Sequence, residues 1–433
     1  MCQPQPESNE VWRSDNEEHA ALLEKILKEK TDKGNIYRPD VLDAMEKTVD
    51  GLSEELRALS IDIHDHPELR FEEKHAHDVL TSFMSAHGFS VTPHFHLDTA
   101  WSATYTHGSG GRTIGINSEM DALPGVGHAC GHNLIAIAGV AVACAIKDAM
   151  EKFDIAGKVH VLGTPAEEGG GGKHILLNAG AYEGMDAVLM CHPAPGPVAS
   201  VSLSSSLANQ VVWVDYKGHT AHAALSPWEG QNALDAAVMA YTSVSVLRQQ
   251  LRPTVRVHGV FSGQDWTANI IPDNARMTWV VRGATVTEAK ETYERVHRCF
   301  EAAALATACT MNVTQINQSS DLRQNATLGG ELASLVYARY GVVDYEWGIK
   351  SASTDFGKVT YAIPSLHPGF SIPTAQGGGN HTHAFADAAA AVEAHDACLR
   401  VCKALSGVGL RVLADEAFVQ RMKATFEEDK KSR

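Results

Sequence analysis

Apolar residues recur every three or four positions in the N-terminal part of the chain, which is the spacing of amphipathic helices. This spacing predicts helices over residues 17–33 and 41–64. A third predicted helix covers 70–88, and a strand-like stretch follows at 89–95. We expect the first helix to form part of an N-terminal arm, residues 1–40.

Short apolar runs then alternate with helical segments, a pattern typical of a parallel sheet covered by helices. The pattern predicts strands over 112–118, 158–163 and 185–191, and helices over 134–149 and 172–179. In such folds the chemistry lies in the loops that leave the carboxyl ends of the strands. We therefore expect functional residues directly after these strands.

The order of elements changes near residue 209. The predicted elements are a strand, a helix, two strands, a helix and a strand, over 211–216, 232–250, 254–261, 275–282, 287–306 and 309–316. This order favours a ferredoxin-like unit with two helices on one face of an antiparallel sheet. Helical patterns resume over 328–340 and 385–405.

The chain is therefore predicted to be an α/β protein in two domains, as a length of 433 residues also favours. The larger, catalytic domain is discontinuous and comprises residues 41–207 and 321–433. The smaller α+β domain, residues 208–320, interrupts it.

Composition narrows the possible partners and locations. With 44% apolar and 20% charged residues, the chain resembles a soluble globular protein. Its net charge of −16 argues against nucleic acid and anionic membranes as partners. Residues 1–20 show no secretory signal, and no stretch approaches the roughly 18 apolar residues of a membrane span. The eight cysteines show no paired spacing, so we expect reduced thiols and a cytoplasmic protein.

The loop Gly127–Asn133 carries the first candidate chemistry. Cys130 and His132 can present a thiolate and an imidazole to one metal ion. Taken alone, the loop fits equally well a buried structural cysteine beside a helix cap at Asn133.

Two adjacent carboxylates, Glu167 and Glu168, follow the predicted strand 158–163 and precede four glycines. In a metallohydrolase, one carboxylate would bind metal while the other acts as general base toward water. The alternative is a solvated acidic turn, which the position after an internal strand disfavours.

His192 follows the next predicted strand in the same way. A single histidine there is more often structural, but three consecutive strand ends of one sheet lie along one edge. Their agreement favours a metal site. Two further histidines, His381 and His383, follow a glycine-rich loop, and spacing does not decide between them.

These segments together resemble peptidase family M20, which includes aminoacylases, glutamate carboxypeptidase and auxin-conjugate amidohydrolases. The resemblance covers roughly residues 45–405 and is nearest to aminoacylase-1-like and β-alanyl-lysine dipeptidase-type proteins. The matching blocks are HDHPELRFEE (64–73), EMDALPGVGHACGHN (119–133), GTPAEEGGGG (163–172), CHPAPG (191–196), GHTAHAALSPWEGQNALDA (218–236), ANIIPDNA (268–275), STDFGKV (353–359) and NHTHAF (380–385).

The resemblance implies a zinc-peptidase-like catalytic domain and an inserted lid that dimerises, so we expect a homodimer. It implies two divalent metal ions per chain, zinc first, with manganese or cobalt as alternatives. The implied metal ligands are Cys130, His132, Glu168, His192 and His381. The implied reaction is hydrolysis of the amide bond of a dipeptide or N-acyl amino acid by metal-activated water.

The resemblance also implies roles for residues that do not bind metal. Glu167 is the implied general base, and Asp121 would orient a ligand. His222 resembles the residue that reaches the scissile carbonyl, often from a partner subunit. Asn269 and Arg282 resemble residues that hold the substrate or its carboxylate.

Three positions depart from the family pattern. Asn133 stands where the auxin-conjugate enzymes usually have Asp, although the dipeptidase-like branch shares Asn. His219 adds a second imidazole beside His222. Glu119 occupies the place of a ligand histidine in the wider family, so the metal prediction depends on the Cys-x-His loop instead.

Two other functions fit the same residues. One is a cysteine-nucleophile enzyme that uses Cys130 with His132 or His128, and its activity would resist chelators. The other is an M20-fold protein that works in the amide-forming direction, or that regulates or binds without turnover. The intact glutamate pair argues against loss of catalysis.

Overall fold

The computed structural model describes residues 36–263 and 265–431 and divides them into two compact units. The first unit comprises the chain up to Ser205, Arg323–Lys350 and the chain from Lys358; the second comprises Ser206–Leu322 and Ser351–Gly357. The predicted helix 17–33 lies outside the described residues. The α/β class predicted from the sequence is confirmed.

A six-stranded mixed sheet forms the centre of the first unit, in the order β1-β2-β4-β3-β5-β13. Strands β4, β3, β5 and β13 run parallel, β2 pairs antiparallel with β4, and β1 pairs antiparallel with β2. Its strands are β1 Ser90–Pro93, β2 Trp101–His107, β3 Arg112–Glu119, β4 Gly157–Thr164, β5 Ala187–Leu189 and β13 Ser365–Leu366.

A second, four-stranded sheet in the same unit has the order β12-β7-β14-β6. Its strands are β6 His192–Pro195, β7 Ser200–Ser202, β12 Val342–Asp344 and β14 Gly369–Ile372. The sequence did not predict this sheet, because strands of three or four residues are too short to show a period of two.

Helix α5, His132–Phe153, packs on β3 and β4 and contacts four further helices of the first unit, α2, α3, α4 and α12. Its length and apolar composition are sufficient for a membrane span, although the sequence analysis expected no stretch of that kind. Because 89% of its most apolar stretch is buried inside the protein, it has the surroundings of a core helix.

The other helices assigned wholly or largely to this unit are α2 Pro39–Gly51, α3 Ser53–Asp65, α4 Lys74–Ala86, α6 Gly172–Asn178, α9 Ala326–Leu335, η3 Val336–Tyr340, α10 Phe356–Ala362, α11 His383–Ala389, α12 Val392–Ala414 and α13 Glu416–Lys430.

Two predicted helices are each divided in the structure. The predicted helix 41–64 consists of α2 and α3, which meet at Leu52, and the predicted helix 385–405 consists of α11 and α12. Apolar spacing continues across both breaks, so periodicity alone did not reveal them. The break at Ala390 leaves the first of the two C-terminal helices only seven residues long.

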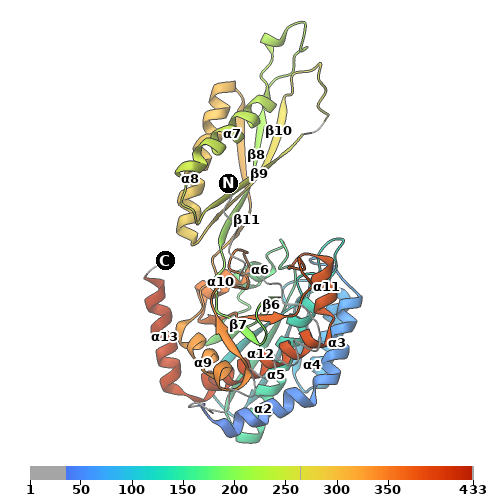
Figure 1. Ribbon diagram of the computed structural model, residues 1–433, viewed down its shortest axis with the longest axis vertical. Helices are drawn as coiled ribbons and strands as arrows, with labels where there is room; N and C mark the ends of the chain where they lie inside the picture. The colour runs from blue at the N-terminus through green and yellow to red at the C-terminus, as the bar shows by residue number, and fades with distance from the viewer. Residues whose placement is uncertain (1–35, 264, 432–433) are drawn as a thin grey trace. The chain divides into compact units, whose positions relative to one another are not determined.

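The second unit has the predicted ferredoxin-like order β8-α7-β9-β10-α8-β11. Its four strands pair antiparallel in the order β11-β8-β10-β9, and Figure 1 shows both helices on one face of the sheet. Trp279 and Phe300 lie in its core. Its elements are β8 Ala208–Lys217, η1 Pro227–Glu229, α7 Ala233–Leu247, η2 Arg248–Gln250, β9 Arg256–Ser262, β10 Asn274–Gly283, α8 Val286–Thr307 and β11 Thr310–Ser319.

Candidate metal centre

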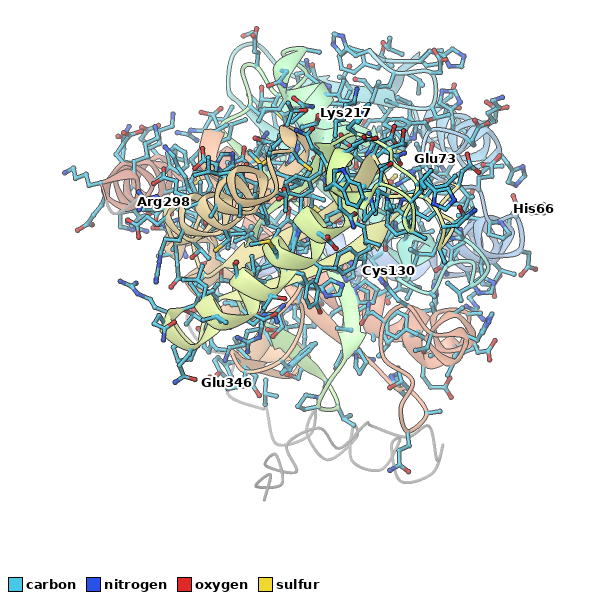
Figure 2. All side chains as sticks on the ribbon, turned by 90° about the horizontal axis from the view of Figure 1, so that it is seen from above. His66, Glu73, Cys130, Lys217, Arg298 and Glu346 are labelled. Carbon is cyan, nitrogen blue, oxygen red and sulfur yellow. The ribbon has the colours of Figure 1, made fainter. Side chains whose placement is uncertain are left out.

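The carboxyl ends of the parallel strands bring the predicted site residues of the first unit together. Glu119 is the last residue of β3, the pair Glu167–Glu168 follows β4, and His192 follows β5. Cys130, which is labelled in Figure 2, lies in the loop before α5. The sheet edge therefore gathers the side chains as the strand pattern predicted.

A glycine shapes the loop that carries the cysteine. Gly131 has a left-handed φ of 75°, and a Cβ atom there would lie 2.5 Å from Cγ of Pro193. Helix α5 begins directly afterwards at His132. Asn133 therefore lies inside the helix, where its amide donates to Ser60 Oγ (3.0 Å) and the Ala389 carbonyl (3.1 Å), so the interpretation of Asn133 as a helix cap is wrong.

Two groups of donor atoms share Cys130. In one group, Cys130, His132 and His192 each offer one donor atom, and these atoms lie within 4.8 Å of one another. In the other group, Cys130, Glu168 and His381 meet the same condition. All five predicted ligands therefore lie in one cluster, whose two donor groups have Cys130 in common.

The predicted general base lies beside this cluster. Glu167, Glu168 and His132 form a further group with donor atoms within 4.8 Å of one another. The paired glutamates thus face the same histidine, an arrangement that a solvated acidic turn would not require.

Asp121 fixes one ligand and the glutamate loop at the same time. Its Oδ1 lies 3.1 Å from Nδ1 of His132, and its Oδ2 accepts the backbone N–H of Glu168 at 2.9 Å. A carboxylate on one imidazole nitrogen directs the other nitrogen to a metal. That other nitrogen, Nε2 of His132, is buried and has no hydrogen-bond partner among the described residues, which fits a metal ligand.

Backbone hydrogen bonds hold the other two histidines of the cluster. His192 Nδ1 donates to the Pro193 carbonyl oxygen (2.8 Å), so its Nε2 faces Cys130 Sγ at 3.4 Å. The backbone N–H of His381 donates to the Ala129 carbonyl oxygen (2.7 Å). The ring of His381 reaches Glu168, with Nε2 3.1 Å from Oε1.

The electrostatics of the cluster favour the ionised forms that bind metal. Burial raises the pKa of Cys130, but the imidazoles of His192, His132 and His381 outweigh it and lower the pKa to about 6. Burial likewise opposes ionisation of Glu168, yet His381 lowers its pKa to about 2. Thiolate, carboxylate and imidazole donors suit zinc.

The pKa of His381 moves in the complementary direction. Hydrogen bonds to Cys130 and Glu168 raise it to about 10, against a smaller effect of burial. Without metal, the negative charges of the cluster are thus balanced by protonated imidazole, and a bound cation would replace that proton.

Two buried charged residues that the sequence did not assign support the cluster. Lys173 Nζ lies 2.6 Å from Glu119 Oε1, and both side chains are fully buried. The other carboxylate oxygen of Glu119 lies 3.5 Å from His132 Nε2. Lys173 follows the four glycines directly, but nothing in the sequence marks that position as buried.

Glu73 and His367 are two further buried residues that sequence analysis missed. Glu73 accepts the backbone N–H of Ala166 (2.8 Å) and the hydroxyl of Thr99 (2.7 Å), directly before the glutamate pair. His367 follows β13 as His192 follows β5, and their ring centroids lie 5.9 Å apart. A strand of only two residues gave no signal for His367.

The second unit places His222 and Asn269 side by side. His222 Nδ1 accepts the backbone N–H groups of Ala224 (3.2 Å) and Leu225 (3.1 Å), so in the neutral ring Nε2 carries the proton. The Ala223 N–H donates to the Asn269 carbonyl oxygen (3.0 Å). The exposed ring of His222 is therefore held as a hydrogen-bond donor.

His219, the competing histidine, is not held in this way. Among the described residues no hydrogen bond to its ring is found, although its backbone pairs with Gln231. An oriented donor is therefore present only at His222 of the two, within the described part of the chain.

Arg282 lies at the other end of strand β10. It pairs with Asn209, whereas Asn274, at the start of β10, follows the loop that carries Asn269. Arg282 follows Asn274 by eight positions, which is about 26 Å along a strand. Arg282 Nη1 donates to Ser353 Oγ at 2.8 Å. The second unit thus keeps Arg282 apart from His222 and Asn269.

Comparison with known proteins relates the sequence to a family of hydrolases. The model of peptidase family M20/M25/M40 matches residues 115–404. Xaa-Arg dipeptidase from Mus musculus is 40% identical over 397 residues, which cover 87% of this chain and 90% of that protein. The Homo sapiens Xaa-Arg dipeptidase is 37% identical with the same coverage of both chains. A p-aminobenzoyl-glutamate hydrolase subunit of Escherichia coli is 33% identical, over 61% of this chain and 58% of that protein.

Solved structures share the fold at low sequence identity. A dinuclear metal-binding peptidase of family M20 from Bacillus subtilis superposes with a TM-score of 0.67 at 20% identity, over 84% of this chain and 99% of that one. An aminobenzoyl-glutamate utilization protein from Klebsiella pneumoniae gives a TM-score of 0.66 at 16% identity, over 85% and 98%.

Proposed function

The chain belongs to peptidase family M20/M25/M40, and we propose that it is a dinuclear metal-dependent dipeptidase that also accepts N-acyl amino acids. Membership confirms the resemblance inferred from the sequence motifs and makes the protein an enzyme of the metallopeptidase and amidohydrolase type. The observation that carries the proposal is the pair of donor groups that share Cys130, with Glu167 beside them.

The five clustered ligands would hold the metals. Cys130, His132 and His192 form one set, and Cys130, Glu168 and His381 form the other. Zinc suits these donors best, and manganese or cobalt are the alternatives. When bound, two divalent cations supply Lewis-acid polarisation of the substrate carbonyl and acidify water.

Glu167 would move the proton in this reaction. Its neighbour Glu168 is engaged by His381 and by the backbone contact to Asp121, so the two adjacent carboxylates have different surroundings. We assign to Glu167 the removal of a proton from the attacking water and its transfer to the leaving amine. This division of labour is the one that the sequence motif implied.

His222, Asn269 and Arg282 would bind the substrate. The Nε2–H of His222 is suited to donate a hydrogen bond to the scissile carbonyl oxygen as negative charge develops there. Arg282 suits the free carboxylate of the substrate. A dipeptide is too short to reach both from one protomer, given about 26 Å of strand between the two ends of β10. The proposal therefore includes a homodimer in which the partner subunit supplies His222.

Dipeptides with a basic C-terminal residue are the first substrates to test. The two mammalian relatives are named Xaa-Arg dipeptidases and align over 87% of this chain. The net charge of −16 favours the approach of cationic substrates. N-acyl amino acids belong in the same panel, because the family includes enzymes that cleave them.

Substitution of the general base tests the mechanism. We expect Glu167→Gln to lower kcat for a dipeptide by about 10²–10⁴-fold, the contribution of a general base, while metal content stays unchanged. The exposed Glu72 provides the matched control, Glu72→Gln. Near-wild-type turnover by Glu167→Gln with metals bound would refute the assignment.

A further inference from the structure

A second cluster of metal-binding side chains lies away from the centre around Cys130. Asp62, His66 and His75 each offer one donor atom, and these atoms lie within 4.8 Å of one another. Asp62 lies in the last turn of α3, His66 directly follows that helix, and His75 lies in the first turn of α4. Figure 2 shows His66 projecting outward, well apart from Cys130.

The three side chains converge on one carboxylate. Asp62 Oδ2 lies 3.0 Å from His75 Nε2, and Oδ1 lies 3.2 Å from His66 Nδ1. The two imidazole centroids are 4.4 Å apart. His66 Nδ1 also lies 2.8 Å from the Asp62 carbonyl oxygen, a contact that orients the ring. Two imidazoles and a carboxylate are the protein ligands of many zinc sites that keep an open position.

The surroundings favour a cation rather than a simple ion pair. Among the described residues, no lysine or arginine pairs with Asp62. Each imidazole instead turns one ring nitrogen toward this carboxylate, and imidazole and carboxylate groups are both common zinc ligands. Glu68 accepts the backbone N–H groups of His75 (2.9 Å) and Ala76 (3.1 Å), which fixes the start of α4.

The segment between His66 and His75 forms hydrogen bonds with the loops of the same unit that carry Asp121 and Glu167. The Ala122 N–H donates to the Glu68 carbonyl oxygen at 2.8 Å, directly after Asp121. Glu73 holds the backbone of Ala166, directly before Glu167. A metal ion on α3 and α4 would therefore restrain both ends of a segment that supports the glutamate loop.

We propose that Asp62, His66 and His75 bind a divalent transition-metal ion of the zinc class. This ion joins α3 to α4 and keeps a position open to water, because the side chains have only three donor groups to offer and are partly exposed. The site does not depend on the proposed dipeptidase activity, because none of its ligands belongs to the catalytic cluster.

Zinc content of full-length variants tests the site. His75→Ala and His66→Ala each remove one ligand, and alanine is tolerated in helices. His107→Ala is the matched control, because His107 also pairs with a carboxylate, Asp154 Oδ1 at 2.8 Å, but joins no group of three ligands in the described chain. All proteins are dialysed against the same zinc buffer and analysed for zinc by elemental analysis, with circular dichroism to verify folding.

The expected result is the loss of one zinc per chain in both His66→Ala and His75→Ala, with the control equal to the wild type. Because the readout is a difference between folded variants, failure of the catalytic centre to bind zinc would lower every value alike and would not imitate this result. Equal zinc in all four proteins, or an equal loss in the control, would overturn the proposal.

Discussion

Glu73 is a buried carboxylic acid whose surroundings favour the neutral form. Burial raises its pKa from 4.5 to about 7, and the hydrogen bond from Thr99 only partly opposes the shift. Because the folded-state pKa lies above the unfolded value, its contribution to stability is full below pH 4.5. That contribution is lost as pH rises through 7, a change of about 3 kcal/mol.

The variant Glu73→Gln should remove this pH dependence. The amide mimics the protonated acid, accepting from the Ala166 N–H and donating to the Thr99 hydroxyl. We expect its stability relative to wild type to rise by about 3 kcal/mol between pH 4.5 and pH 8, in urea unfolding at fixed zinc. Glu72→Gln is the control and should show no such trend. A constant difference between Glu73→Gln and wild type would contradict the assignment.

At the residue scale, the sequence indicates the candidate metal ligands more clearly than the buried residues that hold these ligands and their loops in position. Cys130, the Glu167–Glu168 pair and His192 could be singled out as candidates because each comes after a strand whose apolar run is visible in the sequence, whereas the resemblance to the family selected Glu168 as the ligand. Lys173 and Glu73 could not be identified in this way, because a charged side chain is expected to be solvent-exposed and the sequence alone does not show that it is buried. The structure gives both residues buried ionic or hydrogen-bonded partners.

At the element scale, strand β3 and helix α6 are joined by the ion pair of Glu119 and Lys173. Both side chains are fully buried and 2.6 Å apart. Removing one partner of a buried pair leaves an uncompensated charge, which costs about 3–5 kcal/mol. We therefore expect Lys173→Met to lose that much stability in chemical denaturation of the metal-free protein.

The double variant Lys173→Met with Glu119→Gln should recover much of this loss, because it leaves no buried charge from the pair. Lys350→Met, which breaks an exposed pair with Glu346, is the control and should cost less than about 1 kcal/mol. If Lys173→Met and Lys350→Met were equally stable, the buried pair would not have the importance assigned to it.

The elements themselves were predictable in proportion to their length. The parallel strands and the ferredoxin-like unit carry runs long enough to show a period. Strand β2 was missed although it pairs with β4 over seven positions, because its Ser, Thr and Ala residues lack an apolar run. Helix α13 was missed because its acidic sequence resembles a solvated tail, yet Phe418, Met422 and Phe426 are buried.

At the scale of the whole molecule, the separation of His222 and Arg282 within the second unit predicts shared sites in a dimer. Coexpression of Glu167→Gln and His222→Ala chains tests this. Each homodimer lacks one essential group at both sites, whereas each heterodimer has one complete site. Equal mixing should restore about one quarter of wild-type activity per chain. No recovery, with heterodimers isolated, would mean that His222 acts within its own chain.

Metal dependence of dipeptide hydrolysis distinguishes a dinuclear metallohydrolase from the alternatives. The measurement is cleavage of Xaa-Arg and Xaa-Lys dipeptides before chelation, after chelation and after zinc is restored, with metal content determined on the same samples. For a dinuclear metallohydrolase, we expect cleavage to disappear with the metals and to return with them. Cleavage that survives chelation but is blocked by thiol alkylation would instead favour Cys130 as a nucleophile. Absence of both metal and cleavage in folded protein would contradict the dinuclear hydrolase.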